Sequence, residues 1–255
     1  ASYGVNGNNN IEAYRAYGVY GAINYAGATG MVPSRPENPN LAWERNKTWD
    51  LGLDFSFFDD RLTGSGDIYY RKTSDMLLSK RVPYTTGFGS NFMNVGSMRN
   101  KGIEGQIEGV IIRNSDWFWS VGLNVAMNRS LVLDLGDSEF LSVADSRAGD
   151  NDSTPVRIVK GMRLYNYYAR DYYGVNPSTG DPLWYDKNGK LTGDISKARY
   201  VYAGSPEAKA TGGFNTTVSW KGLSLSAYFE FVAGNKVFVA DQNIGFGYNM
   251  NNNNT

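Results

Sequence analysis

Apolar and polar residues alternate one by one through the stretch Thr48–Phe57. Successive side chains of a β-strand point to opposite faces, whereas this spacing would scatter an apolar set around a helix. The stretch therefore predicts a strand with one apolar and one polar face. The apolar set is Trp49, Leu51, Leu53, Phe55 and Phe57, and the polar set is Thr48, Asp50, Gly52, Asp54 and Ser56.

The same alternation recurs in five further stretches, of which the first is the loosest. Most of them run for about 9 to 12 residues, close to the length that a tilted strand needs to cross a bilayer. Strands of soluble proteins more often run for about five or six residues. The recurrence predicts an all-β, antiparallel chain, and the stretches are Arg61–Thr73, Gly102–Val110, Trp119–Asn128, Gly213–Trp220 and Leu223–Phe231.

The connections between these stretches fall into two length classes. Tight links occur at 58–61, 113–116 and 221–222, and long connections occupy 7–47, 74–100 and 129–161. Tight turns at one end and long loops at the other are typical of outer-membrane barrels. A soluble sandwich usually keeps its connections short at both ends. The pattern favours the barrel, and the sandwich stays open as the alternative.

Composition excludes several classes of protein. The chain has no His and no Cys, which excludes a Ser-His triad, a Cys nucleophile and disulfides, and we expect no enzyme, metal site or cofactor. Its 25 Lys and Arg balance 25 Asp and Glu, which argues against a nucleic-acid partner. No apolar run reaches the roughly 18 to 20 residues of a membrane helix, and no signal peptide is visible at the N-terminus.

The Tyr-rich stretch Leu164–Val175 fits the barrel pattern less well. It reads as a strand followed by a turn at Asn176–Asp181, where Pro and Gly supply the turn chemistry. The next strand, Pro182–Asp186, is too short to cross a bilayer and contains a Pro. We expect this hairpin to lie outside the bilayer or to fold into the barrel lumen.

Several short motifs resemble the barrel of SusC/RagA-type TonB-dependent outer-membrane transporters. They occur in the family's order, and the resemblance covers nearly the whole chain. The motifs are Asn38-Pro39-Asn40-Leu41-Ala42-Trp43-Glu44, Leu51-Gly52-Leu53-Asp54-Phe55, Arg71-Lys72-Thr73-Ser74-Asp75-Met76-Leu77-Leu78, Asn94-Val95-Gly96, Asn100-Lys101-Gly102-Ile103-Glu104, Gly174-Val175-Asn176-Pro177, Thr179-Gly180-Asp181, Gly204-Ser205-Pro206 and Thr211-Gly212-Gly213-Phe214.

The resemblance implies a transmembrane barrel of about 22 strands with a plugged lumen. It also implies a SusD-type surface lipoprotein as a lid, energy supplied by TonB through a Ton box on the plug, and an oligosaccharide or oligopeptide as cargo. The plug and the Ton box are not visible in this sequence, so residues 1–255 are expected to form a partial barrel domain. We expect an open sheet of roughly eight to ten strands whose edges pair with other strands of the transporter, because unpaired backbone groups are costly in lipid.

The polar faces of the strands predict a set of lumen-facing residues. These residues would line the import path, hold the plug, or simply hydrate a polar lumen. No pair among them can be identified as catalytic, because the strand register is unknown from the sequence. The set is Asp50, Asp54, Asp67, Glu104, Glu108, Asn124, Asn215 and Glu230.

Aromatic residues outside the regular strands are candidates for binding a sugar or a peptide. Aromatic rings stack on apolar patches of a ligand, and Tyr hydroxyls bond its polar groups. The alternatives are an interfacial girdle for the Tyr-rich stretch and packing between loops or against a lid for the loop residues. The candidates are Tyr84, Phe88, Tyr165, Tyr167, Tyr168 and Tyr172, with Phe92 and Tyr173 beside them.

Four tryptophans lie close to the expected strand ends, namely Trp49, Trp117, Trp119 and Trp220. We expect them to belong mainly to the girdle on the side of the tight turns.

The stretch 186–190 has some resemblance to a calcium loop, but its Gly position and the missing closing Glu exclude an EF-hand. A hairpin turn at Asn188-Gly189 is the better interpretation. The acidic group Asp145, Asp150 and Asp152 could bind a cation in an external loop, but mobile acidic loops without a cation are commoner.

The function that these observations predict is active import of oligomeric nutrients across the outer membrane of a Gram-negative bacterium. The chain would contribute barrel wall and external loops, in contact with outer-membrane lipid, the plug, the lid and the cargo. Two alternatives remain open: a passive porin or structural outer-membrane protein, and a soluble all-β module that binds glycans.

Overall fold

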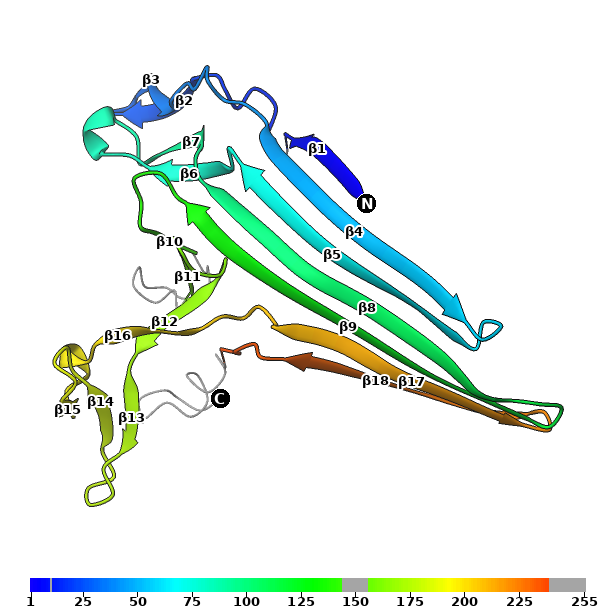
Figure 1. Cartoon of the computed structure of the whole chain (residues 1–255). Helices are drawn as coiled ribbons and strands as arrows, with labels where there is room; N and C mark the ends of the chain where they lie inside the picture. Colours follow the sequence, from blue (N-terminus) through cyan, green and yellow to red (C-terminus); the bar gives the residue numbers. More distant parts are fainter. Residues whose placement is uncertain (10, 144–155, 239–255) are drawn as a thin grey trace.

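A seven-stranded antiparallel sheet dominates the computed structural model, which describes residues 1–9, 11–143 and 156–238 (Figure 1). Each stretch with alternating polarity forms one of its strands, so these predictions are confirmed, and the strands mostly extend further than the alternation. In spatial order the strands are β1 (Ser2–Asn8), β4 (Glu44–Phe57), β5 (Leu62–Ser74), β8 (Ser97–Arg113), β9 (Trp117–Asp134), β17 (Ala210–Trp220) and β18 (Leu223–Ala233).

Three tight turns join neighbouring strands at one end of this sheet, which we call the tight-turn end. Between β4 and β5, Asp59 and Asp60 have φ angles of 54° and 60°, a region that Asp tolerates better than most residues. Between β8 and β9, the Asn114 side chain accepts hydrogen bonds from the amides of Asp116 and Trp117, at 3.0 and 2.7 Å. Lys221 and Gly222 connect β17 to β18.

Smaller sheets and hairpins gather at the opposite, long-loop end (Figure 1). A four-stranded and a three-stranded sheet follow β9, while one hairpin precedes β4 and another follows β5. The first hairpin pairs β2 (Val19–Tyr25) with β3 (Ala28–Arg35), and the second pairs β6 (Leu77–Arg81) with β7 (Ser90–Asn94) around the 3-10 helix η1 (Tyr84–Thr86). The four-stranded sheet consists of β10 (Phe140–Ser142), β11 (Val156–Val159), β12 (Asn166–Arg170) and β16 (Tyr200–Gly204). The three-stranded sheet consists of β13 (Tyr172–Val175), β14 (Pro182–Tyr185) and β15 (Leu191–Thr192), and the 3-10 helix η2 (Ile195–Lys197) precedes β16.

The large sheet has fewer strands than the eight to ten expected. The single strand predicted over Leu164–Val175 is divided at Asp171 into β12 and β13, which belong to different small sheets. The predicted turn at Asn176–Asp181 is confirmed by a hydrogen bond of 2.8 Å from the Asn176 amide to the Asp181 carbonyl. These segments are too short to add to the long strands, and the whole hairpin lies outside the large sheet.

The described residues bury very little apolar surface. Their buried hydrophobic side chains are Val132, Leu135 and Ala198. The accessible surface of the chain is 18383 Å², whereas a compact monomer of 28.2 kDa would expose about 11,000 Å². No helix in the described part of the chain has the length and apolar character to span a membrane. The fold is an extended sheet without a core of its own.

The strand register places the apolar residues of the large sheet on one face, here called the apolar face. Leu51 opposes Ile68, Ile68 opposes Ile103, and Ile103 opposes Met127 across four strands. Nearer the tight turns, Leu123 opposes Phe214, which opposes Phe229. Along β9, Trp117 and Met127 are about 33 Å apart, or about 25 Å in height for a strand tilted by about 40°.

The register also corrects the placement of Trp49. Trp117 and Trp220 lie beside tight turns and stack with ring centroids 5.7 Å apart, as the girdle interpretation requires. Trp49 instead lies towards the long-loop end of β4 and packs on Tyr3, with ring centroids 4.3 Å apart. The strand continues beyond Trp49 to Glu44, so Trp49 is far from the turn at residue 58.

Glycines in the strands make room for aromatic rings of the neighbouring strand. The Phe231 ring covers Gly212, and a Cβ at residue 212 would lie 2.7 Å from that ring and would also collide with the Asn124 carbonyl oxygen. The Tyr69 ring covers Gly102 in a similar way on the other face. Each of these rings fits only where a glycine stands opposite it, so the contacts favour one register between the two strands.

We expect Gly212→Ala to destabilise the assembled barrel by about 1–3 kcal/mol, because the new methyl group overlaps backbone as well as a ring. Denaturant unfolding of the assembled protein in lipid vesicles, followed by Trp fluorescence, measures this change. Gly105→Ala is the matched control, since the nearest atom to its Cβ would be the Ser65 carbonyl oxygen at 3.7 Å. Equal effects of the two changes would contradict the steric explanation.

Candidate functional site

The second face of the large sheet, here called the polar face, carries all eight residues that the sequence assigned to the lumen. Asp67 directly opposes Glu104, and in the neighbouring row Asp54 opposes Ser65, which opposes Gln106. The rows continue across β9 to β17 and β18. The eight residues are Asp50, Asp54, Asp67, Glu104, Glu108, Asn124, Asn215 and Glu230.

This polar face is strongly anionic. Six of the eight residues are carboxylates, and within residues 1–9, 11–143 and 156–238 none of them forms an ion pair. Like charges directly opposite each other destabilise a strand pair, so the Asp67–Glu104 pair has a cost within the isolated sheet. A cationic or hydrogen-bond-donating partner on this face would offset that cost.

Three shallow hollows lie along the polar face. The one nearest the long-loop end has a volume of about 460 Å³ and is bounded by Asp50, Tyr69, Arg71 and Glu104. The next has about 340 Å³, beside Asp67 and Gln106. The one nearest the tight turns has about 400 Å³ and is lined by Asp54, Glu108, Asn124, Asn215 and Tyr228, among others.

Four of the lining residues just named, Tyr69, Arg71, Gln106 and Tyr228, were absent from the set predicted to face the lumen. Tyr69, Arg71 and Tyr228 have the same strand parity as the predicted carboxylates. The Tyr69 hydroxyl donates a hydrogen bond of 3.0 Å to the Asn128 side chain. The alternation of the strands contained the signal for these residues, since both tyrosines stand at polar-face positions in their strands.

The loops at the long-loop end are connected by Asn94. Its side-chain amide donates to the carbonyls of Ala42 and Asp75 at 2.7 and 2.8 Å, and its oxygen accepts from the Ala42 amide at 2.7 Å. Glu44 accepts from the Leu77 amide and from the Asn8 side chain, both at 2.8 Å. The motifs that resemble the transporter family at residues 38–44 and 94–96 therefore supply loop anchors.

The β6–β7 hairpin that these anchors hold carries two of the candidate aromatic residues. Tyr84 lies in η1 with its side chain 88% exposed, and Phe88 is half-buried. Gly87 ends the 3-10 turn with φ 82° and donates to the Tyr84 carbonyl at 2.9 Å. Nearby, Lys80 donates a hydrogen bond of 2.7 Å to Asp137, which lowers the pKa of that carboxyl group.

Tyr168 lies in a continuous stack of rings and guanidinium groups across the four-stranded sheet. The Tyr200 ring lies 4.9 Å from Tyr168 and nearly parallel to it. Arg157, from the strand on the other side of β12, lies 3.7 Å from the Tyr168 centroid and 4.3 Å from that of Phe140. Arg170 continues the stack over Tyr200 at 4.1 Å. A ligand that stacked on Tyr168 would have to displace one of these neighbours.

The other predicted tyrosines have more open surroundings. Tyr172 in β13 is 54% exposed and meets Trp184 edge to face, with ring centroids 6.2 Å apart. Tyr165 is partly exposed, and Tyr167 is half-buried in β12. The structure therefore distributes the Tyr-rich stretch over two small sheets and does not gather it into one pocket.

Asp186 forms the turn that the sequence predicted at Asn188-Gly189. Its carboxylate accepts from the amides of Asn188 and Lys190, both at 2.8 Å, and Gly189 has φ 76°. A hairpin turn between β14 and β15 is confirmed.

Asp194 lies beyond β15, where hydrogen bonds from the hydroxyl and amide of Ser196 lower the pKa of its carboxyl group. Asp145, Asp150 and Asp152 lie outside the described residues.

We expect Asn94→Ala to loosen the β6–β7 hairpin by about 1–3 kcal/mol, since three hydrogen bonds to backbone groups are lost. Limited proteolysis with trypsin, which cleaves after Lys80 and Arg81, should then proceed about five times faster or more. Asn91→Ala in the same hairpin is the control, because the Asn91 side chain forms no hydrogen bond in the described part of the chain. Unchanged cleavage of the Asn94 variant would contradict the anchoring role.

Known proteins resemble this chain in sequence and in fold. The family model for a TonB dependent receptor-like β-barrel matches residues 1–252. TonB-dependent receptor P26 of Formosa agariphila is 33% identical over 257 residues, which cover 93% of this chain and 26% of that receptor. TonB-dependent receptor SusC of Bacteroides thetaiotaomicron is 31% identical over 250 residues, which cover 92% of this chain and 25% of SusC.

Solved structures of a RagAB peptide importer have the same fold. The structure in the open-open state has a TM-score of 0.78 and 31% identity, over 91% of this chain and 25% of that chain. A further RagAB structure, described as a peptide transporter, has a TM-score of 0.75 and 32% identity, over 90% and 26% of the two chains.

The chain thus spans about a quarter of the length of the relatives that it matches. The resemblance to SusC/RagA-type transporters is confirmed, and so is the barrel-type sheet, which is not closed among the residues that the structure describes. The chain belongs to the TonB-dependent receptor-like β-barrel family, whose members are outer-membrane transport proteins and not enzymes.

Proposed function

We propose that this chain forms wall and external loops of a TonB-dependent barrel that imports oligosaccharides or oligopeptides across the outer membrane of a Gram-negative bacterium. The observation that carries the proposal is the two-sided sheet. Its apolar face is exposed over a height of about 25 Å, with Trp49, Leu123 and Phe229 exposed by 58%, 45% and 62%. Its other face is polar, as a water-filled lumen requires, and it carries six of the predicted carboxylates.

The edges of the large sheet support a larger barrel. Within residues 1–9, 11–143 and 156–238, β1 and β18 each pair on one side only, and unpaired backbone groups cost several kcal/mol each in lipid. We propose that both edges pair with further strands, which close the barrel around a plug. Energy then comes from TonB acting on that plug, and a SusD-like surface lipoprotein covers the long-loop end; the similarity to SusC and RagAB supports this partnership.

The polar face would line the passage or contact the plug. Its unpaired carboxylates accept hydrogen bonds from hydroxyl and amine groups, which both oligosaccharides and oligopeptides carry. A hydrogen-bond donor from the plug or the cargo would bind most favourably at the Asp67–Glu104 pair, because its binding would remove the repulsion between the two carboxylates. Water alone would hydrate the same groups between transport cycles.

At the long-loop end, Tyr84 and Tyr172 are the aromatic residues that we propose for contact with cargo or lid. Both residues are exposed, by 88% and 54%. Tyr165, Tyr167 and Phe88 offer smaller surfaces, and Tyr168 acts mainly in the stack with Arg157 and Tyr200.

A soluble glycan-binding module is poorly supported by these observations. Such a module would bury the residues that this sheet exposes, and its surface would be far closer to about 11,000 Å² than to 18383 Å². A passive pore would use the same sheet, so it must be distinguished by experiment.

The first experiment compares energised and passive uptake. Cells that express the assembled barrel are given fluorescent oligosaccharide and oligopeptide pools, with and without a functional TonB. We expect uptake of at least one pool to require TonB. Uptake of the same pools that persists without TonB would establish a passive pore.

The second experiment tests the lipid face. Leu53, which is 68% exposed on the apolar face, opposes Gly66 near the middle of β4 and β5. We expect Leu53→Arg to disfavour assembly in the membrane by about 2–4 kcal/mol. Asp54→Arg is the matched control on the polar face and should be much milder. The fraction of heat-modifiable, membrane-inserted barrel measures both, and the reverse order would overturn the assignment of faces.

A further inference from the structure

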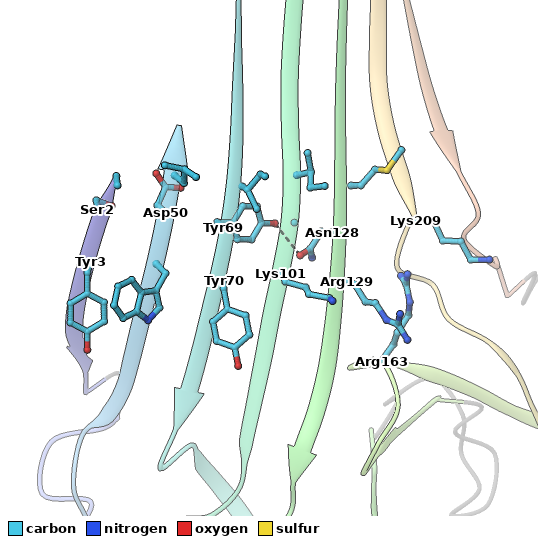
Figure 2. Close-up of a pocket in the computed structure, with 17 residues that line it drawn as sticks. Ser2, Tyr3, Asp50, Tyr69, Tyr70, Lys101, Asn128, Arg129, Arg163 and Lys209 are labelled. Atoms are coloured by element: carbon cyan, nitrogen blue, oxygen red, sulfur yellow. Dashed lines mark hydrogen bonds between the residues drawn. The ribbon is translucent and has the colours of Figure 1, made fainter. Parts of the chain in front are cut away.

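A belt of aromatic and basic residues crosses the apolar face just above the apolar band, towards the long-loop end. Tyr3 opposes Trp49, which opposes Tyr70, and the row continues through Lys101 to Arg129. The next row is Val5, Lys47, Lys72, Arg99 and Leu131. Figure 2 shows Tyr3, Tyr70, Lys101 and Arg129 side by side on β1, β5, β8 and β9.

Like charges face one another within this belt. Lys47 opposes Lys72, which opposes Arg99, and Lys101 opposes Arg129. In the described part of the chain, no carboxylate lies within ion-pair distance of these five side chains. No Asp or Glu occupies the apolar face between the tight turns and this belt. Directly opposed cations destabilise a sheet, and a bound anion would remove that repulsion.

A hollow of about 930 Å³ lies where the belt meets the apolar band (Figure 2). The aromatic rings of Tyr3, Trp49 and Tyr70 line one part of it, and Lys101 and Arg129 another. Arg163, which donates to the Glu207 and Ala208 carbonyls and forms an ion pair of 3.9 Å with the Glu207 carboxylate, also lines the hollow, as does Asp50 at its edge. Its apolar lining is Leu51, Ile68, Ile103 and Met127. The site therefore combines anion-binding groups with an adjoining hydrocarbon-like surface.

We infer that this hollow binds a phosphorylated, acylated lipid of the outer leaflet, the chemical class of lipid A. The phosphate lies against Lys101 and Arg129, and an acyl chain follows the apolar lining towards the middle of the band. A small soluble anion would leave the apolar lining exposed, and an uncharged lipid would leave the cations opposed. The inference rests on the proposed function, because it requires the apolar face to lie against lipid.

The experiment measures lipid binding to the assembled barrel in detergent by native mass spectrometry. The probes are lipid A, a phosphate-free lipid A with the same acyl chains, and inorganic phosphate. We expect lipid A to bind best and the double variant Lys101→Gln/Arg129→Gln to lose about 30-fold in its affinity, the effect of two basic residues at an anionic surface. Lys221→Gln, at the tight-turn end, is the control and should bind lipid A like the parent protein.

Three results would overturn the inference: equal binding of the two lipids, an unchanged affinity of the double variant, or inorganic phosphate that displaces lipid A. Failure of the proposed function is recognised separately. If Leu53→Arg assembles in the membrane as well as Asp54→Arg, the face assignment itself is wrong. If Leu53→Arg and Asp54→Arg behave as expected but lipid A binds no better than its phosphate-free form, the barrel assignment stands and the lipid site alone is refuted.

Discussion

The register of the long strands is the constraint on which the rest of this structure depends. Side chains alternate between two faces, so a slip of one residue would exchange every apolar residue for a polar one. In this sheet a one-residue slip of β4, for example, would turn Asp50 and Asp54 towards the face that now carries Leu51 and Leu53. Aromatic rings seated over glycines, such as Phe231 over Gly212, oppose such a slip locally.

The same register separates charge as well as polarity. Acidic residues collect on the polar face, and basic residues collect in a belt at one edge of the apolar band. Neither set is neutralised within the described residues. The net charge of zero conceals this separation. Each face is therefore suited to a partner outside the chain: hydrogen-bond donors on the polar face and anions at the belt.

Specific polar contacts connect the described loops at the long-loop end. Asn94 and Glu44 bond backbone groups from segments far apart in the sequence, and Arg157 and Tyr168 fix the four-stranded sheet. These contacts position a few exposed aromatic residues, including Tyr84, on a defined scaffold.

The sequence by itself determined the long strands, their two faces and their tight turns, because a period of two and turn chemistry are local properties. It also contained enough motif information to identify the family. Only the tertiary structure decided which strands pair, and this set the depth of Trp49, the division of Leu164–Val175 between two small sheets and the stack that covers Tyr168. It likewise brought Lys47, Lys72 and Arg99 into one row from three strands. Pairing joins residues distant in the chain, and a local pattern contains no record of which neighbour each strand will meet.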